Sequence, residues 1–150
     1  MIMQARSAAV WDTEPTSETW TDKATGYSLH IQRHDSMGHL CGYVGIPAEH
    51  PWYGKSDEHV LMADNDYPEV HGGLTYSSSH KPGDPRGSKS SLWWLGFDCA
   101  HCGDLSPVML KYGDRSDRDE TYKDWAYVKA ECESLARQAL QTARSIESAP

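Results

Sequence analysis

Polar and hydrophobic residues alternate in a stretch near the start of the chain. Residues 27–32 read Tyr-Ser-Leu-His-Ile-Gln, so that every second side chain is large and hydrophobic. A period of two predicts a half-buried strand whose polar residues face water. After the turn-like residues 35–38, residues 39–46 predict a second strand, and the two strands form a hairpin. Gly42 and Gly45 indicate a bulge or a close approach of another group to the backbone.

The most apolar run of the chain is residues 92–97, Leu-Trp-Trp-Leu-Gly-Phe. Such a run, bounded by serines on one side and by Gly103 and Pro107 on the other, predicts a buried strand. Residues 74–77 alternate again and follow Gly72 and Gly73, which can adopt backbone angles closed to other residues. We expect these two strands to pair as an antiparallel hairpin.

The segment between these strands, residues 77–91, concentrates serine, glycine and proline and shows no apolar anchor. It predicts one long mobile loop. Lys81, Arg86 and Lys89 make this loop locally positive, so that it would neutralise a phosphate-bearing ligand if it folded over a site. We expect its removal to leave the melting temperature nearly unchanged, because exposed positions contribute little to stability.

A helical pattern runs from about Thr121 to Ser145. Thr121 and Asp124 resemble a capping box at its start. Hydrophobic residues recur on one stripe of this segment: Trp125, Val128, Cys132, Leu135, Ala139, Ala143 and Ile146. The pattern predicts an α+β fold, with a small antiparallel sheet and one long C-terminal helix packed on it.

The chain has 150 residues, the size of one domain. No repeat or boundary divides it, so residues 1–150 are predicted to form a single domain. Residues 1–20 show no sustained period and predict an irregular arm, with one short strand as an option. Residues 59–62 predict a further short strand.

The formal net charge is -8 and the isoelectric point is near 5.4. This charge argues against a general nucleic-acid binder, which usually presents a basic face. No run approaches the roughly 18 apolar residues of a membrane helix, and the N-terminus lacks the apolar region of a signal peptide. We therefore expect a cytoplasmic protein with no membrane partner.

Four cysteines are present, and without a secretory signal they are predicted to be thiols or ligands rather than disulfides. A zinc site on Cys99, Cys102, Cys41 and one histidine is the weaker alternative, because structural zinc sites normally show two ligand pairs. Redox use of the Cys99/Cys102 pair is weaker still, since its flanking run is strand-like. Cys132 lies on the helical stripe and is predicted to be core.

Side chains able to do chemistry follow the apolar run directly. Asp98, His101 and Asp104 recur at intervals of three. Because the outer ends of paired antiparallel strands meet at one edge, the hairpin would bring His71 near Asp98. Convergence also requires the backbone to turn before Gly103, since residues three apart on a strand point to opposite faces. This set could hold a divalent metal or supply a general base.

A structural interpretation remains open beside this one. Asp98 and Asp104 could cap turns through hydrogen bonds to nearby backbone N–H groups, while His101 fills a polar gap. His71 with its two following glycines could be a tight turn that carries a surface histidine. His50 is predicted to lie at a loop surface.

Five stretches form a compound motif: residues 41–47, 50–54, 70–76, 94–101 with Gly103 and Asp104, and 127–133. Together they resemble a group of small uncharacterised proteins of bacteriophages and prophages. The resemblance covers the chain from Cys41 to the end of the predicted helix. It implies a phage origin and the host cytoplasm, and it brings no established activity.

The residues favour a polar pocket that binds a small anionic, nucleotide-like molecule. Its chemistry would come from His71, Asp98, His101 and Asp104. Ligand contacts are expected from Gly72, Gly73, Thr75, Lys81, Arg86, Lys89 and Trp94. With zinc, manganese or magnesium on Asp98, His101 and Asp104, the pocket would hydrolyse the ligand, because a metal lowers the pKa of bound water. The resemblance makes a host-defence signal an attractive ligand class.

The alternative belongs to another class of protein, a non-catalytic inhibitor that binds a host protein through an acidic, aromatic surface. Six Trp and eight Tyr accompany a single Phe, and amphipathic rings suit interfaces. Such a surface also leaves a homo-oligomer open. A structural virion component fits less well, since the chain lacks repeats.

Overall fold

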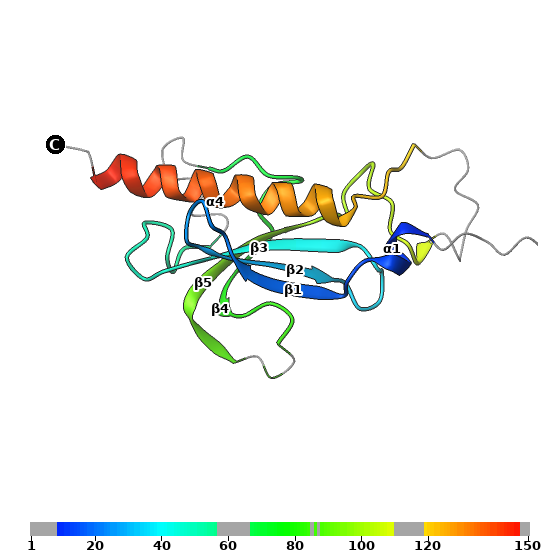
Figure 1. Cartoon of the computed structure of the whole chain (residues 1–150), viewed down its shortest axis with the longest axis horizontal. Helices are drawn as coiled ribbons and strands as arrows, with labels where there is room; N and C mark the ends of the chain where they lie inside the picture. The colour runs from blue at the N-terminus through cyan, green and yellow to red at the C-terminus, as the bar shows by residue number, and fades with distance from the viewer. Residues whose placement is uncertain (1–8, 57–66, 85, 87, 110–118, 148–150) are drawn as a thin grey trace, which may run out of the picture.

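A five-stranded antiparallel sheet carries one long helix on one face (Figure 1). The computed structural model describes residues 9–56, 67–84, 86, 88–109 and 119–147. The elements are α1 (Val10–Thr13), β1 (Ser17–Thr21), β2 (Ser28–Arg33), β3 (Leu40–Ile46), β4 (Tyr76–His80), β5 (Lys89–Asp98) and α4 (Trp125–Glu147). The strands lie in the order β1-β2-β3-β5-β4. The predicted α+β class is confirmed.

The β2–β3 hairpin is present as predicted, with Ile31 opposite Gly42. Leu29 and Ile31 are fully buried in the core, as their alternation requires. The polar residues of β2 do not simply face water, because His30 is only 4% exposed. Its Nδ1 lies 2.6 Å from Thr19 Oγ1 and its Nε2 lies 3.1 Å from the side-chain oxygen of Gln32. These partners satisfy the buried ring.

Gly42 marks a close approach between the sheet and the helix. A Cβ atom at this position would lie 2.5 Å from Phe97 Cζ and 2.6 Å from Cys132 Sγ. Both atoms belong to buried side chains of the core. The glycine therefore lets the middle of α4 pack directly on β3, which explains the expectation of a close approach rather than a bulge.

The helix begins at Trp125 and not at Thr121. Asp124 is the capping residue, because its Oδ1 accepts a hydrogen bond of 2.9 Å from the N–H of Tyr127. Thr121 instead pairs through its backbone with Gly103. The predicted capping box was therefore wrong. A second cap comes from Glu14, whose Oε2 accepts the N–H of Trp125 at 2.6 Å.

The buried side of α4 follows the predicted stripe from Val128 to Ala139. Its buried residues are Val128, Cys132, Leu135, Ala136, Ala139 and Thr142. Trp125 is partly buried against the core, while Ile146 at the other end is 54% exposed. The prediction of a stripe that runs to Ile146 was wrong at that end, where α4 extends past the core (Figure 1).

The β4–β5 hairpin replaces most of the predicted long loop. Tyr76 pairs with Gly96 and His80 pairs with Lys89, so only residues 81–88 connect the strands. Backbone pairing requires no particular side chain, which is why a serine-rich segment forms an edge strand. In Figure 1 this hairpin curves away from the helix.

The connection itself has an apolar anchor, contrary to the prediction. Pro82 is buried. Gly83 has a φ of +79°, and a Cβ there would lie 2.1 Å from the side-chain oxygen of Gln32. The connection is thus packed against β2. The expectation that it can be removed without loss of stability assumed that no apolar side chain anchors it, and this assumption was wrong.

The N-terminal arm contains more structure than its sequence predicted. Within the described part of residues 1–20, α1 is followed by most of β1, which pairs along its whole length with β2. The predicted strand at residues 59–62 lies outside the described residues. No helix in the described ranges is both long and apolar enough to cross a membrane.

His50 is buried, so the prediction of a loop-surface residue was wrong. The side chain is 5% exposed, and its Nε2 lies 2.7 Å from the carbonyl oxygen of Ala139 in α4. Its Nδ1 accepts the N–H of Trp52 at 3.0 Å. His50 therefore joins the loop after β3 to the helix.

Leu135 and Ile146 provide a matched test of the helix packing, because one is fully buried and the other 54% exposed on the same helix. Leu135→Ala should lower the free energy of unfolding by about 2–5 kcal/mol. Ile146→Ala should change it by less than about 0.5 kcal/mol. Urea denaturation measures both values, and equal losses would contradict the packing.

Three buried histidines predict a stability that depends on pH. Burial lowers the pKa of His30, His39 and His50 below the ordinary histidine value. The unfolded chain then binds more protons than the folded protein as the pH falls through about 6.5. The free energy of unfolding should be highest above this pH and should decrease below it. Urea denaturation across this range checks the sign, and an increase on acidification would show that these rings are not held neutral.

Candidate functional site

His71, Asp98, His101 and Asp104 lie together beside the N-terminal half of α4. The His71 and His101 rings have centroids 6.2 Å apart. Nε2 of His71 lies 2.7 Å from Oδ2 of Asp104, and Nε2 of His101 lies 3.2 Å from Oδ1 of Asp98. The four residues lie close together, as the hairpin argument predicts, but His71 and His101 line two different cavities rather than one common pocket. The catalytic role of these residues stays a prediction.

Strand pairing explains why these segments meet. The N–H of Thr75 donates to the carbonyl oxygen of Gly96 at 2.8 Å, which extends the β4–β5 ladder toward His71. The Thr75 hydroxyl also donates to Oδ2 of Asp98 at 2.9 Å. Thr75 therefore joins the two segments by contacting Asp98.

The backbone turns after β5, as convergence requires. The N–H of Ala100 donates to Oδ1 of Asp98 at 3.1 Å, and the N–H of Asp104 donates to the carbonyl oxygen of His101 at 2.9 Å. The N–H of His101 donates to Oδ2 of Asp104 at 3.0 Å. Asp98 and Asp104 thus each accept a hydrogen bond from a backbone N–H of the turn. The capping roles of the structural interpretation are real and coexist with the contacts to histidine.

The ring of His101 packs directly against the backbone of Gly72. Gly72 has a φ of +68°, and a Cβ there would lie 2.2 Å from Cδ2 of His101. Gly73 has a φ of +81° and faces the hydroxyl of Tyr67. Gly72 therefore lies against the His101 ring and Gly73 lies near the Tyr67 hydroxyl, and the contact of the two glycines with a ligand stays a prediction.

Asp104 is the most buried group of the cluster, with a side chain that is 2% exposed. Its Oδ1 lies 3.3 Å from Nζ of Lys123. Burial alone would raise the pKa of Asp104, but hydrogen bonds from His71, from the His101 N–H and from Lys123 lower it overall. Asp104 is therefore an anion at neutral pH.

Tyr127 completes the cluster, and sequence reasoning missed it. Its hydroxyl lies 2.8 Å from Nδ1 of His71, and the tyrosine is 38% exposed. Because Nε2 of His71 must donate to the Asp104 carboxylate, a neutral ring accepts at Nδ1 from the Tyr127 hydroxyl. The signal available in the sequence is a large aromatic residue that lies off the apolar stripe of its helix.

Burial raises the pKa of Tyr127, and the nearby groups Glu131, Cys99 and Asp104 raise it further. The hydroxyl therefore remains protonated and donates. Glu131 also accepts the backbone N–H of His71 at 3.0 Å, which fixes the turn that carries the ring. The result is a hydrogen-bonded chain from a buried carboxylate through His71 to an exposed hydroxyl.

No protein-family model, curated protein or solved structure matches this chain. The resemblance to phage proteins is thus not tested by these comparisons and stays a prediction. The geometry of the cluster alone carries the functional argument.

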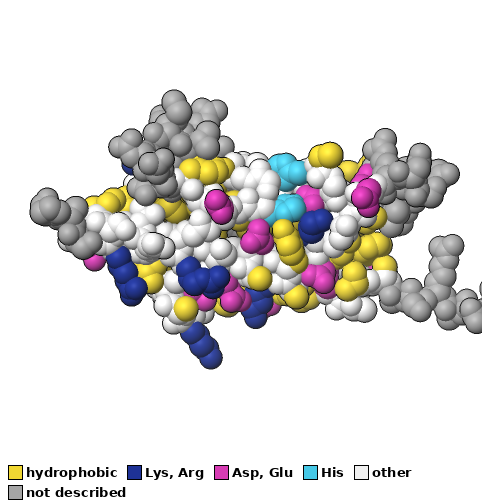
Figure 2. Space-filling model, turned by 90° about the horizontal axis from the view of Figure 1, so that it is seen from above, with side chains coloured by type: hydrophobic (Ala, Val, Ile, Leu, Met, Phe, Trp, Pro, Cys, Tyr) yellow, Lys and Arg dark blue, Asp and Glu magenta, His cyan; other side chains and the backbone are white. Residues whose placement is uncertain are grey.

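Two cavities flank the cluster. One has a volume of about 570 Å³ and is lined by His101 and Asp104 together with Asp119 and Glu120. The other, of about 550 Å³, is lined by His71, Glu69, Glu131, Ser134 and Gln138. In the space-filling view, histidine side chains reach the surface among acidic side chains (Figure 2). An anion would need a counter-charge to bind here.

The other predicted ligand contacts do not lie at the cluster. Trp94 is 2% exposed and is a core residue, so its ring cannot stack on a base. Gly83 of the connection lies against Gln32 and His30 on the face of β2 opposite to the core residues Leu29 and Ile31, whereas the cluster lies beside α4. The predicted lid over the site was therefore wrong.

Among the residues that the structure describes, no three His, Cys, Asp or Glu side chains are placed to hold one metal ion. Both oxygens of Asp104 already have partners, which leaves Asp98 and His101 as the predicted ligands that lie side by side. A divalent metal here stays a prediction.

The four cysteines are free thiols. Burial raises the pKa of Cys41 to about 11, with a further contribution from Asp98. Burial raises the pKa of Cys99 as well. Cys99 lies in the core, whereas Cys102 is exposed. The thiols of Cys41 and Cys99 therefore stay protonated in the metal-free protein, and the zinc alternative stays a prediction. Cys132 is core, as predicted.

Gly72 and Gly54 offer a matched test of how the site is built. Both have a positive φ, but nothing lies within 4 Å of a Cβ at Gly54. Alanine at either position should cost about 1–2 kcal/mol in backbone strain. Gly72→Ala should in addition displace the His101 ring and shift the NMR signals of both site histidines. Unchanged histidine signals in Gly72→Ala would show that the ring does not rest on this glycine.

Proposed function

We propose that the protein is a small-molecule hydrolase in which His71 acts as the general base. The observation that carries this proposal is the hydrogen-bonded chain Asp104–His71–Tyr127, with distances of 2.7 and 2.8 Å. A carboxylate that orients a histidine, which in turn contacts a hydroxyl, is an arrangement that activates the hydroxyl or a water in its place.

The proton path follows from the hydrogen bonds. As a water in the place of the Tyr127 hydroxyl attacks the ligand, one of its protons passes to Nδ1 of His71 and the bond to the leaving group breaks. If the Tyr127 oxygen attacks instead, it forms a covalent bond to the ligand, and in a second step a water that gives its proton to His71 cleaves this bond and restores the tyrosine. The imidazolium that forms is stabilised by the anionic Asp104, which keeps Nε2 bound throughout. The same proton then returns to the leaving group. Lys123 holds the other oxygen of Asp104 and so keeps the carboxylate in place.

The ligand class proposed is a small anionic, nucleotide-like molecule. The acidic lining by Asp119 and Glu120 means that such a molecule requires a counter-charge. Zinc, manganese or magnesium bound by Asp98 and His101 would supply it and would polarise a phosphoryl oxygen. The resemblance to phage proteins makes a host-defence signal the first class to test.

Turnover of a nucleotide panel with each metal, followed by chromatography, tests the catalytic proposal. His71→Asn and Tyr127→Phe should each lower kcat by about 10²–10⁴-fold, as expected for loss of acid–base catalysis. His101→Ala should abolish metal or ligand binding with little effect on stability. A matched control is Tyr53→Phe, because this hydroxyl donates only to the carbonyl oxygen of Ser91 in the described contacts.

Equal rates for Tyr127→Phe and wild type would remove Tyr127 from the chemistry. A His71→Asn variant as active as wild type would contradict the proposal itself. Elemental analysis of purified protein tests separately whether hydrolysis requires a metal. A preparation that turns over its ligand without any divalent metal would exclude a metal-dependent hydrolase.

A second candidate is a non-catalytic protein that binds a basic segment of a host protein. It is favoured by the exposed Tyr127 beside a cavity with Glu69 and Glu131, since exposed tyrosines anchor interfaces and carboxylates attract basic partners. In that case the double variant Glu69→Gln/Glu131→Gln should weaken partner binding. No turnover should be measured for the wild-type protein or for His71→Asn.

A further inference from the structure

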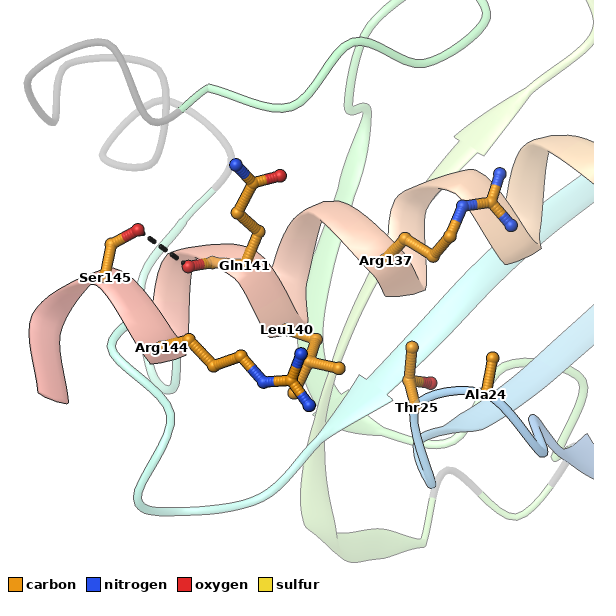
Figure 3. Close-up of a pocket in the computed structure, with 7 residues that line it drawn as sticks. All are labelled: Ala24, Thr25, Arg137, Leu140, Gln141, Arg144 and Ser145. Atoms are coloured by element: carbon orange, nitrogen blue, oxygen red, sulfur yellow. Dashed lines mark hydrogen bonds between the residues drawn. The ribbon is translucent and has the colours of Figure 1, made fainter. Parts of the chain in front are cut away.

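An open groove lies between the C-terminal half of α4 and the turn that joins β1 to β2. It has a volume of about 470 Å³ and is lined by Arg137, Leu140 and Arg144 of the helix and by Ala24 and Thr25 of the turn, among others. Figure 3 shows Leu140 between the two arginines along α4, with the turn residues across from them. This volume falls within the roughly 300–1,000 Å³ of small-molecule pockets.

The charge of this groove differs from that of the rest of the molecule. Its lining contains two arginines and no Asp or Glu, in a chain with a net charge of -8. Three other cavities of the described structure each contain carboxylates: Asp119 and Glu120, Asp35 and Asp84, or Glu69 and Glu131. In Figure 2 several Lys and Arg side chains lie along one edge of the molecule, with Asp and Glu side chains among them. An anion would meet its complementary charge here rather than at His71.

The spacing of the arginines suits a ligand with several phosphate groups. Residues seven apart on a helix lie on one side, about 10.5 Å apart along the axis. A guanidinium has five N–H donors in a fixed fork, so each arginine can keep a contact within the protein and still bind a phosphate. Leu140 adds a partly buried apolar surface between them, against which an uncharged part of a ligand can pack.

The turn across the groove does not oppose an anion. Asp22 is the acidic residue of this turn, and it is 8% exposed with its Oδ2 accepting the hydroxyl of Thr25 at 2.6 Å. Its carboxylate is thus directed into the turn. The backbone N–H of Gly26 also bonds to the Asp22 carbonyl oxygen, so the turn is held closed on itself.

We infer that this groove binds a small molecule carrying two or more phosphate groups, held by Arg137 and Arg144. The inference does not rest on the proposed hydrolase, because Tyr127 and Glu131 of the His71 cluster belong to the other half of α4. A nucleotide and an inorganic polyphosphate share this chemistry, and the experiment separates them.

Isothermal titration calorimetry of the full-length protein tests the inference, with ATP and inorganic tripolyphosphate as probes. Both should bind the wild-type protein, and added salt should weaken both. The double variant Arg137→Gln/Arg144→Gln should bind about tenfold more weakly or worse, because bonds to charged groups are lost. Tighter binding of ATP than of tripolyphosphate would assign the nucleoside to the surface of Leu140.

Two controls keep the outcome interpretable. Lys129→Gln removes an exposed charge of the same helix that lies over Trp20, outside the groove, and should leave binding unchanged. Arg137→Lys/Arg144→Lys keeps the charge and should retain part of the affinity. The inference is overturned if neither probe binds, or if the glutamine variant binds as wild type does. It is also overturned if binding is lost in His71→Asn and kept in the arginine variants, which would place the phosphates at the His71 site.

Discussion

The buried carboxylate of Asp104 is the interaction on which the candidate site depends. It holds the turn after β5 through the His101 N–H, the turn before β4 through His71 Nε2, and the segment before α4 through Lys123. Backbone bonds between residue 121 and the Gly103 and Leu105 positions reinforce the last of these contacts. Three segments that are distant in sequence therefore meet at one anion, which is kept ionised by the same donors that it organises.

The position of α4 sets where that anion can act. Gly42 lets the helix approach β3 closely, and Asp124 and Glu14 fix the residue at which the helix begins. With the start of the helix fixed, Tyr127 on its first turn reaches the His71 ring from the opposite side to Asp104. The same helix carries Arg137 and Arg144 on its second half, so one element contributes to both proposed sites.

The periodic segments could be predicted from the sequence because each buries one face. The β2–β3 hairpin, the apolar strand and the helical stripe follow from alternation or from a period of 3.6. The edge strands were predicted only in part, because they are held by backbone pairing and carry few large apolar side chains. The strand predicted at residues 74–77 shares only Tyr76 and Ser77 with β4, and β1 was given only as an option within residues 1–20. His50 was misjudged for a related reason, since its burial depends on a carbonyl of α4 that is 89 residues away.

Part of the candidate site was also within reach of the sequence. The hairpin argument brought the turn with His71 to the end of β5, because antiparallel pairing places these ends at one edge. The contact of His71 is with Asp104, however, while Asp98 contacts Thr75 and His101. Tyr127 and Lys123 were missed, since their contacts depend on how the helix start docks on two turns. The basic connection between β4 and β5 was wrongly placed over the site, because the curvature of a hairpin and the packing of Pro82 are tertiary properties.

The central claim is that Asp104 orients His71 so that Nδ1 accepts from Tyr127. The nitrogen chemical shifts of the His71 ring, measured by NMR at about pH 8 where an ordinary histidine is neutral, test it most directly. The account predicts a ring protonated at Nε2 and unprotonated at Nδ1, and a loss of this preference in Asp104→Asn. A ring protonated at Nδ1, or an even mixture of the two tautomers in the wild-type protein, would contradict it.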